Sequence, residues 1–323
     1  MAATIAPTTS SARPAGPRKL LQRLRSGDDA AYVVTLAAAV TVLVITALLI
    51  FELYKNSALP RQKFGWSFLT SSAWDPVAGE FGALPFIYGT VVTSALALLI
   101  AIPLGVGAAI FLAELAPPWI SGVLTFLIEL LAAVPSVIIG LLGIFVMIPI
   151  LTSIAPSIQA ALGWSPAFSG PFYGVSLFTA GVVLSVMIIP FIISISREVI
   201  LTVPNDQREA ALALGATRWE TTWDAVVPFA KKGIAGSIFL ALARALGETM
   251  AVTMVVGNDP KIHASLMAPG YSIAAVIANQ FTEATGELYL SSLIELGLVL
   301  FGLTIVINGG ARLLVMSTER GEG

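Results

Sequence analysis

Arg244 and Glu248 are two ionisable residues inside an otherwise apolar stretch, residues 233–257, which is as long as a membrane-spanning helix. A charged side chain at the centre of a bilayer costs at least about 2.5 to 3.5 kcal/mol, so each needs a partner or a water-filled cavity. Their spacing of four places them on one helix face, where they can neutralise each other. The guanidinium is also a planar fork of donors that suits a tetrahedral oxyanion. The spacing alone leaves a structural ion pair and an anion site as equal alternatives.

The composition of the 323-residue chain indicates a membrane protein. Hydrophobic residues make up 57% and charged residues 11%, with a mean hydropathy of +0.90, whereas about 25% of the residues in soluble domains are charged. The chain has no cysteine and one histidine, which excludes thiolate and multi-histidine metal sites. A net charge of −2 argues against nucleic-acid binding, which needs a concentrated basic face. We therefore expect an all-α integral membrane protein with no metal and no catalytic residue.

Six apolar segments are long enough to span a bilayer, since about 20 helical residues cross its hydrocarbon core. A cluster of Ser, Pro and Gly at residues 153–174 separates the third segment from the fourth. We expect six transmembrane helices. The segments are residues 32–51, 81–113, 119–151, 172–195, 233–257 and 288–311.

The distribution of Lys and Arg predicts that both termini are cytoplasmic. With the N-terminus inside, twelve of these residues fall in inner segments and four in outer segments, and positively charged loops stay on the cytoplasmic side. Residues 1–31 are basic and rich in Ala, Pro and Thr, which is typical of a disordered tail. Residues 32–315 then form the transmembrane domain, and residues 316–323 form a short cytoplasmic tail.

The long inner loop between the fourth and fifth segments has a pattern that predicts two short helices. Asp206 and Glu209 resemble a capping box in front of an Ala- and Leu-rich stretch. Thr217 and Glu220 repeat the capping pattern before a second helix that ends ahead of Pro228. The pattern alone fits a solvated linker as well as it fits a docking element.

The same loop, at about residues 205–228, resembles the EAA loop of ATP-binding-cassette (ABC) importer permeases through Glu209, Ala210, Ala211 and Gly215. The resemblance implies the type I importer permease fold, in which this loop carries the coupling helix that seats on a cytoplasmic ATPase. Small alanines allow close approach, and Gly215 is the expected left-handed end of the helix. The chain has no Walker phosphate-binding motif. We therefore expect no cofactor in this chain, with ATP and Mg on the partner ATPase subunits.

A second resemblance is narrower. Residues 244–253, Arg-Ala-Leu-Gly-Glu-Thr-Met-Ala-Val-Thr, resemble the signature of the phosphate-specific transport permeases of the PstC type, and residues 133–140 resemble that family's Pro-Ser-Val helix. The similarity extends over roughly residues 30–315. It implies a substrate pathway that includes Arg244, Glu248, Thr249, Pro135 and Ser136. For the last two residues, a kink with a carbonyl capped by the hydroxyl is the simpler alternative.

The resemblance implies a multi-pass subunit of a phosphate importer in the bacterial plasma (inner) membrane. Its implied partners are a second homologous permease subunit, two ATPase subunits and an extracytoplasmic phosphate-binding protein. An EAA loop indicates the energy source and not the cargo. Another oxyanion, such as sulfate or molybdate, is therefore the nearest alternative.

A stand-alone ion-coupled transporter is an alternative of another class, in which Glu129, Glu248 and Glu295 would be proton sites. Because an unpaired carboxylate repels an anion, we instead expect Glu129 and Glu295 to serve helix packing or a subunit interface. An intramembrane enzyme is remote, since the sequence has neither a G-x-S-x-G elbow nor a set of metal ligands. His263 lies in an outer loop, and we expect no role for it.

Overall fold

A computed structural model describes the backbone of residues 28–320 and the side chains of residues 31–313. The chain divides into two units, residues 1–55 and 56–323, and each is described by itself. The described part of the first unit is the helix α2, Asp28–Asn56. Its residues Ala31–Asn56 are apolar and long enough to cross a membrane, as predicted. The predicted tail lies outside the described residues up to residue 27, and its last four residues belong to α2.

In the described part of the second unit, the regular secondary structure is helical except for one short antiparallel hairpin. In this hairpin Trp74 pairs with Phe81 and Asp75 with Glu80. The all-α prediction is therefore confirmed. Its long helices are α5 (Leu84–Ile110), α9 (Leu177–Leu201), α12 (Val227–Leu246) and α15 (Glu287–Arg320). Its shorter elements are α3 (Ala58–Phe64), α4 (Ser67–Thr70), β1 (Trp74–Asp75), β2 (Glu80–Phe81), the π-helical turn η1 (Phe111–Leu115), α6 (Pro118–Ala132), α7 (Ser136–Leu142), the π-helical turn η2 (Gly143–Met147), α8 (Ile148–Leu162), the 3-10 turn η3 (Pro166–Phe168), α10 (Asn205–Ala213), α11 (Arg218–Thr221), the π-helical turn η4 (Thr222–Val226), α13 (Met250–Val255) and α14 (Ile273–Gln280).

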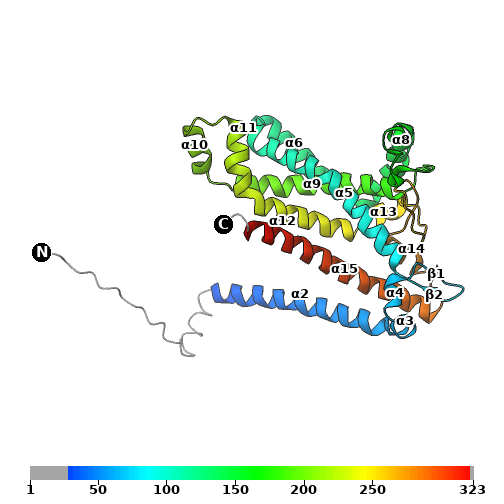
Figure 1. The fold of residues 1–323 in the computed structure, drawn as a ribbon. Coiled ribbons are helices and arrows are strands. Elements are labelled where there is room, and N and C mark those ends of the chain that lie inside the picture. Colours follow the sequence, from blue (N-terminus) through cyan, green and yellow to red (C-terminus); the bar gives the residue numbers. More distant parts are fainter. Residues whose placement is uncertain (1–27, 321–323) are drawn as a thin grey trace, which may run out of the picture. The chain divides into compact units, whose positions relative to one another are not determined.

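Six helices in the described part of the chain are long and apolar enough to span a membrane, which confirms the predicted number. The third differs from the prediction, because the chain breaks between α6 and α7 and the continuous candidate span is Ser136–Leu162. In Figure 1, α8 turns away from the direction of the long helices. The C-terminal helix continues to residue 320, so most of the predicted tail at 316–323 is helical.

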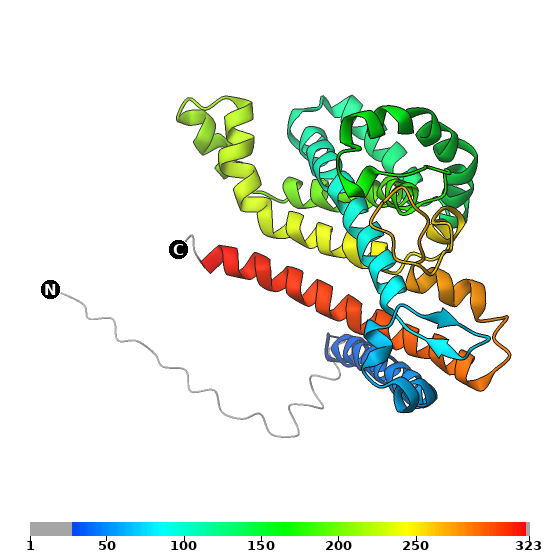
Figure 2. The same ribbon diagram turned by 45° about the vertical axis from the view of Figure 1, so that its right-hand side comes forward.

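The long helices of the second unit run side by side (Figures 1 and 2). α10 and α11 lie at one end of them, and the hairpin β1–β2 lies at the other. The loop predicted to be cytoplasmic and the segment predicted to be external are therefore at opposite ends, as a spanning arrangement requires. Which end faces the cytoplasm remains a prediction.

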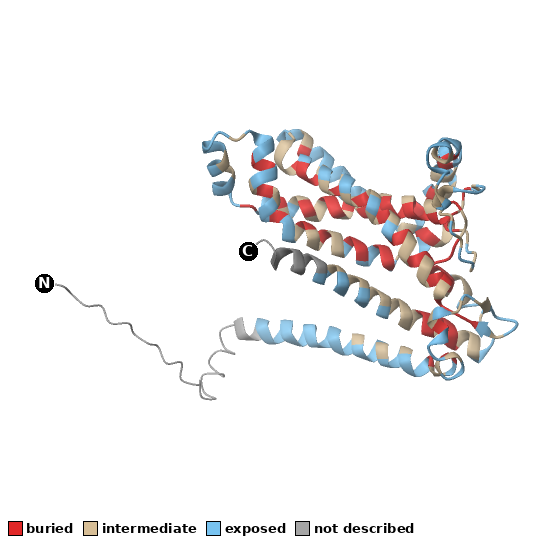
Figure 3. Cartoon of the chain, in the orientation of Figure 1, coloured by how far each residue is buried: buried red, intermediate tan, exposed pale blue. Residues whose placement is uncertain are grey.

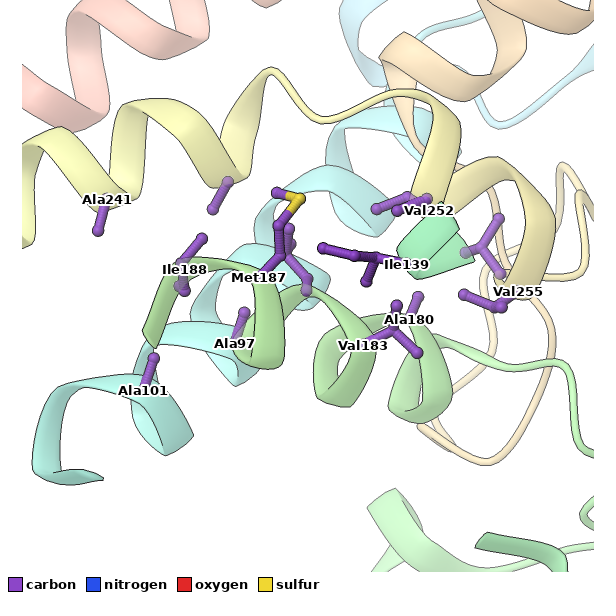
Figure 4. Close-up of a cluster of buried hydrophobic side chains, with 14 of the residues drawn as sticks. Ala97, Ala101, Ile139, Ala180, Val183, Met187, Ile188, Ala241, Val252 and Val255 are labelled. Carbon is purple, nitrogen blue, oxygen red and sulfur yellow. The ribbon is translucent and has the colours of Figure 1, made fainter. Parts of the chain in front are cut away.

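Small side chains allow the central helices to approach closely. The core drawn in Figure 4 includes Ala97 and Ala101 of α5, Ala180 of α9 and Ala241 of α12. Within a bilayer, helices associate through such close packing, because lipid is as apolar as the side chains. α9 is buried along most of its length, whereas α6 and α10 are largely exposed (Figure 3).

Hydroxyl groups satisfy one another and the backbone within this core. Ser196 of α9 and Ser237 of α12 are hydrogen-bonded at 2.7 Å, which ties the two helices together. Thr90 donates from its hydroxyl to Phe86 O at 2.8 Å, while its oxygen accepts from the N–H of Ile273 at 2.9 Å. A buried backbone donor beyond α5 is thus satisfied without water.

Candidate functional site

The loop after α9 forms the two predicted helices, α10 and α11. α10 ends in a Schellman turn, in which the N–H of Gly215 donates to Leu212 O at 2.9 Å and that of Ala216 to Ala211 O at 3.2 Å. Gly215 has φ +92°, a conformation that favours glycine. The left-handed stop predicted at this residue is confirmed.

The second predicted capping box is also present. Thr217 Oγ1 accepts from the N–H of Glu220 at 3.3 Å, and Glu220 Oε2 accepts from the N–H of Thr217 at 2.7 Å. The prediction that this helix ends before Pro228 is wrong, because α11 continues through η4 into α12. Pro228 therefore lies inside a continuous helix, where its missing N–H follows directly on the π-helical turn η4.

The first predicted capping box is absent. α10 begins at Asn205, its N-cap is Pro204, and no side chain makes the cap hydrogen bond. Asp206 therefore lies inside the first turn instead of before it. A carboxylate at that position still interacts favourably with the positive end of the helix dipole.

α10 presents an exposed surface. No residue of the helix is buried; Glu209 and Ala210 are exposed, and Ala211 is half-buried. Leu214 is 90% exposed, and Trp219 of α11 is 56% exposed. We call Glu209, Ala210, Leu214 and Trp219 the α10 surface. Large exposed apolar side chains next to a carboxylate are typical of a protein-binding site.

Arg208 is a residue of this loop that sequence reasoning missed. Its Nη2 donates to Glu114 Oε1 at 2.6 Å, and the two residues are 94 positions apart. Both side chains are largely buried, with 18% and 11% of their surfaces exposed. No local pattern indicates a pair so distant in sequence.

Arg244 lies in the last turn of α12 and is exposed. Its guanidinium carbon is 5.7 Å from the ring centroid of Phe191 in α9, a cation–π contact. Within residues 31–313, no carboxylate forms an ion pair with it. Its donors are therefore available to an anion.

The predicted continuous helix over residues 233–257 is wrong. α12 ends at Leu246, and α13 begins after a three-residue break. The break removes Arg244 and Glu248 from a common helix face, and the ion pair that was one of the two alternatives does not form. Glu248 Oε1 instead accepts from the N–H of Ala251 at 3.2 Å, near the positive end of α13.

The other predicted pathway residues lie at helix starts. Pro135 is the exposed N-cap of α7, and the half-buried Ser136 is its first residue. Thr249, also half-buried, is the N-cap of α13. α7 packs against α13, and a Cβ on Gly140 would lie 3.1 Å from the Cα of Ala251. The structure thus brings together the two elements that begin at these residues, while Arg244 stands in the last turn before the α12–α13 break.

The two remaining carboxylates have different surroundings. Glu295 is 8% exposed, and its Oε2 lies 3.7 Å from Arg61 Nε, which agrees with the expected packing role. Glu129 is exposed on α6. It is a candidate for a subunit interface, as expected from the sequence, and nothing in the structure tests that expectation.

His263 has a more defined setting than the sequence indicated. Its Nε2 is 3.3 Å from Asp259 Oδ2, and its main-chain oxygen accepts from the hydroxyl of Tyr88 at 2.9 Å. Both side chains of the pair line a cavity of ≈ 450 Å³ between two loops. The remaining lining is mainly Pro, Ala and Ser residues together with Tyr173.

Comparisons with known proteins identify one family model and several related permeases. A family model described as "binding-protein-dependent transport system inner membrane component" matches residues 101–319. The chain is 46% identical over 308 residues to the phosphate transport system permease protein PstC of Mesorhizobium japonicum, covering 94% of each. It is 48% identical over 264 residues to the protein of the same name from Xylella fastidiosa (strain Temecula1), covering 80% of this chain and 81% of that protein.

A solved structure supports the fold. The chain matches a chain of a bacterial ABC transporter involved in the import of the acidic polysaccharide alginate, with a TM-score of 0.54 and 15% identity. The match covers 91% of this chain and 98% of the other. Six apolar helices and a family of inner-membrane components make the protein a multi-pass membrane protein. With identity above 45% over most of its length, the chain belongs to the PstC family of phosphate transport system permease proteins.

Proposed function

We propose that the chain is the membrane permease subunit of an ATP-driven importer of inorganic phosphate. The observation that carries the phosphate assignment is the 46% identity over 308 residues with a permease named for phosphate transport. Transport systems of this family depend on a binding protein and on ATPase chains, and the permease subunit is not itself an ATPase.

The finer arrangement is also part of the proposal. Both termini and α10 face the cytoplasm, residues 32–315 form the transmembrane domain, and residues 1–31 and 316–323 are cytoplasmic tails. A second homologous permease subunit, two ATPase subunits and an extracytoplasmic phosphate-binding protein complete the complex. The α10 surface seats on one ATPase subunit, and these subunits hold ATP and Mg.

Arg244 supplies the chemistry of a transient anion site. A guanidinium can offer two parallel N–H donors to two oxygens of one phosphate. Contact with Phe191 orients it without neutralising its charge. The hydroxyls of Ser136 and Thr249 are secondary candidates, because their two helices begin beside each other.

Energy from the ATPase subunits enters through α10. Closure of these subunits moves α10 and rocks the attached helices, which changes access to Arg244 from the cytoplasmic side to the outer side. The binding protein then delivers phosphate, and reopening exposes the anion to the cytoplasm. Arg244 must hold phosphate weakly enough to release it at this point.

Uptake by cells tests this proposal. Cells that lack only this chain are resupplied with wild type or Glu209→Lys and given radiolabelled phosphate or sulfate. We expect wild type to restore phosphate uptake alone, and Glu209→Lys to lose both uptake and association with the ATPase. Restoration of sulfate uptake without phosphate uptake would contradict the phosphate assignment. Normal ATPase association in Glu209→Lys would contradict the role of the α10 surface.

A further inference from the structure

The side chain of Arg208 joins three elements at the end of the molecule that carries α10. Its Nε lies 3.2 Å from both carboxylate oxygens of Glu114 in η1, and its Nη2 donates to Glu114 Oε1 at 2.6 Å. The same side chain donates to Ile200 O at 3.0 Å and to Val203 O at 2.5 Å, at the end of α9. One guanidinium therefore ties α10 to the last turns of both α5–η1 and α9.

Pro204 explains why the carbonyls of α9 accept from an arginine. The helical partner of Ile200 O would be the N–H four residues later, but that residue is Pro204 and has no N–H. Ile200 O accepts instead from the N–H of Val203 at 3.2 Å, and Arg208 Nη2 is a second donor to the same oxygen. A cation is also favoured near the negative end of a helix. The geometry thus fixes Arg208 for a physical reason that does not depend on Glu114.

Apart from Arg208, the described contacts attach α10 to the start of the α12 helix and not to α5. None of its residues is buried, and it packs mainly on α11 and η4, the start of the helix that continues into α12. The side chains of Arg208 and Glu114 are by contrast largely buried, with only 18% and 11% of their surfaces exposed. A bidentate pair in this setting holds a fixed direction better than a flexible contact.

We propose that the Arg208–Glu114 link is the connection through which movement of α10 reaches α5. α5 packs most extensively against α9, and its Ala97 and Ala101 share a core cluster with Ala241 and Ala245 of α12, the helix that carries Arg244. Arg208 and Glu114 are thus positioning residues for energy coupling, touching neither ATP nor the transported anion. This inference rests on the proposed function of the chain as an importer subunit.

The test uses the complete complex in proteoliposomes, with wild type, Arg208→Ala, Arg208→Lys, Glu114→Ala and the double variant Arg208→Ala/Glu114→Ala. Arg312→Ala is the control, because Arg312 is an exposed arginine on α15. Three quantities are measured: ATPase retained on purification, ATP hydrolysed, and anion imported per ATP, with phosphate and sulfate in parallel. If sulfate alone is imported, the proposed function in phosphate import is wrong. The amount of sulfate imported per ATP then still tests the Arg208–Glu114 link.

We expect each alanine variant to retain the ATPase and hydrolyse ATP, but to import at least tenfold less anion per ATP. Arg208→Lys should be intermediate, since lysine keeps the charge without the fork, and the control should match wild type. The double variant should fall no further than Arg208→Ala, because that variant already removes the link to Glu114. An unchanged ratio in Arg208→Ala, or a fall that only follows loss of the ATPase, would overturn the link.

A second measurement does not depend on the cargo. The natural chain has no cysteine, so Leu104→Cys on α5, at a position 57% exposed, gives a single site in this chain for a small thiol reagent. We expect ATP to change its labelling rate at least threefold in an otherwise wild-type complex and not in Arg208→Ala. An equal change in both would show that movement reaches α5 without the link.

Discussion

Arg244 lies in the last turn of α12, and none of the carboxylates within residues 31–313 forms an ion pair with it, which favours an anion site over a buried ion pair. The i to i+4 spacing left neutralisation by Glu248 and an anion site as equal alternatives, but the helix ends between the two residues. Glu248 then caps α13 through the N–H of Ala251. The arginine keeps its donors, and the phosphate hypothesis gains support over the structural alternative.

Substitutions at Arg244 separate charge from geometry. Arg244→Gln removes hydrogen bonds to a charged group, which contribute about 1.5 to 3 kcal/mol, so phosphate uptake should fall by about one to two orders of magnitude. Arg244→Lys retains the charge but loses the planar fork, and it should be intermediate. Uptake rates are measured at equal amounts of assembled complex. Wild-type uptake by Arg244→Gln would place the anion site elsewhere.

Glu248 should behave as a helix cap. Glu248→Gln retains an oxygen that can accept from the N–H of Ala251, and it should keep assembly and uptake near wild type. Glu248→Ala leaves this donor unpaired and should destabilise the complex by about 0.5 to 2 kcal/mol, as loss of a cap does. Thermal unfolding of the purified complex measures the difference. Loss of uptake in a stably assembled Glu248→Gln would instead indicate a need for its charge.

The helix breaks are the elements that sequence patterns place least well. Apolar runs in a membrane lack the polar face that marks the ends of a soluble helix, so the stretch around Pro135 and the stretch after Leu246 both looked continuous. The loop carrying α10 was predictable in more detail, because Gly215, Thr217 and Glu220 are polar or conformational signals. The Asp206 capping box failed because Pro204 starts the helix earlier.

Gly140 permits the packing of α7 on α13. A Cβ there would lie 2.6 Å from Met254 Sδ and 3.1 Å from the Cα of Ala251. Gly140→Val should therefore push the two helices apart, destabilise the complex by about 1 to 3 kcal/mol and reduce uptake. Gly107→Val is the matched control, because a Cβ on Gly107 meets nothing within 4 Å. Equal thermal stability of the two variants would count against the α7–α13 contact.

At the scale of the whole molecule, the sequence predicted six membrane-spanning helices and membership of the PstC family, and both predictions are confirmed. The sequence could not predict contacts between distant segments. Arg208 and Glu114 are 94 residues apart, and Arg61 and Glu295 lie near opposite ends of the sequence of the second unit. Such pairs are set by how the helices assemble. A charge in the sequence indicates only that a partner is needed.

Orientation in the membrane can be tested on the natural cysteine-free chain. Leu214→Cys, on the α10 surface, and Val77→Cys, in the hairpin turn, introduce thiols at positions 90% and 98% exposed. We expect a membrane-impermeant maleimide to label Val77→Cys in intact spheroplasts and Leu214→Cys only in inside-out vesicles. The reverse pattern would contradict the predicted cytoplasmic position of α10.

The most direct measurement is phosphate uptake by proteoliposomes that contain the complete complex and the binding protein, with ATP supplied on the ATPase side. We predict that uptake requires ATP, persists when an ionophore collapses the proton gradient, and is not competed by sulfate. Uptake that is driven by a proton gradient without ATP would contradict the account and favour an ion-coupled transporter. Uptake of sulfate in place of phosphate would leave an ATP-driven importer with another cargo.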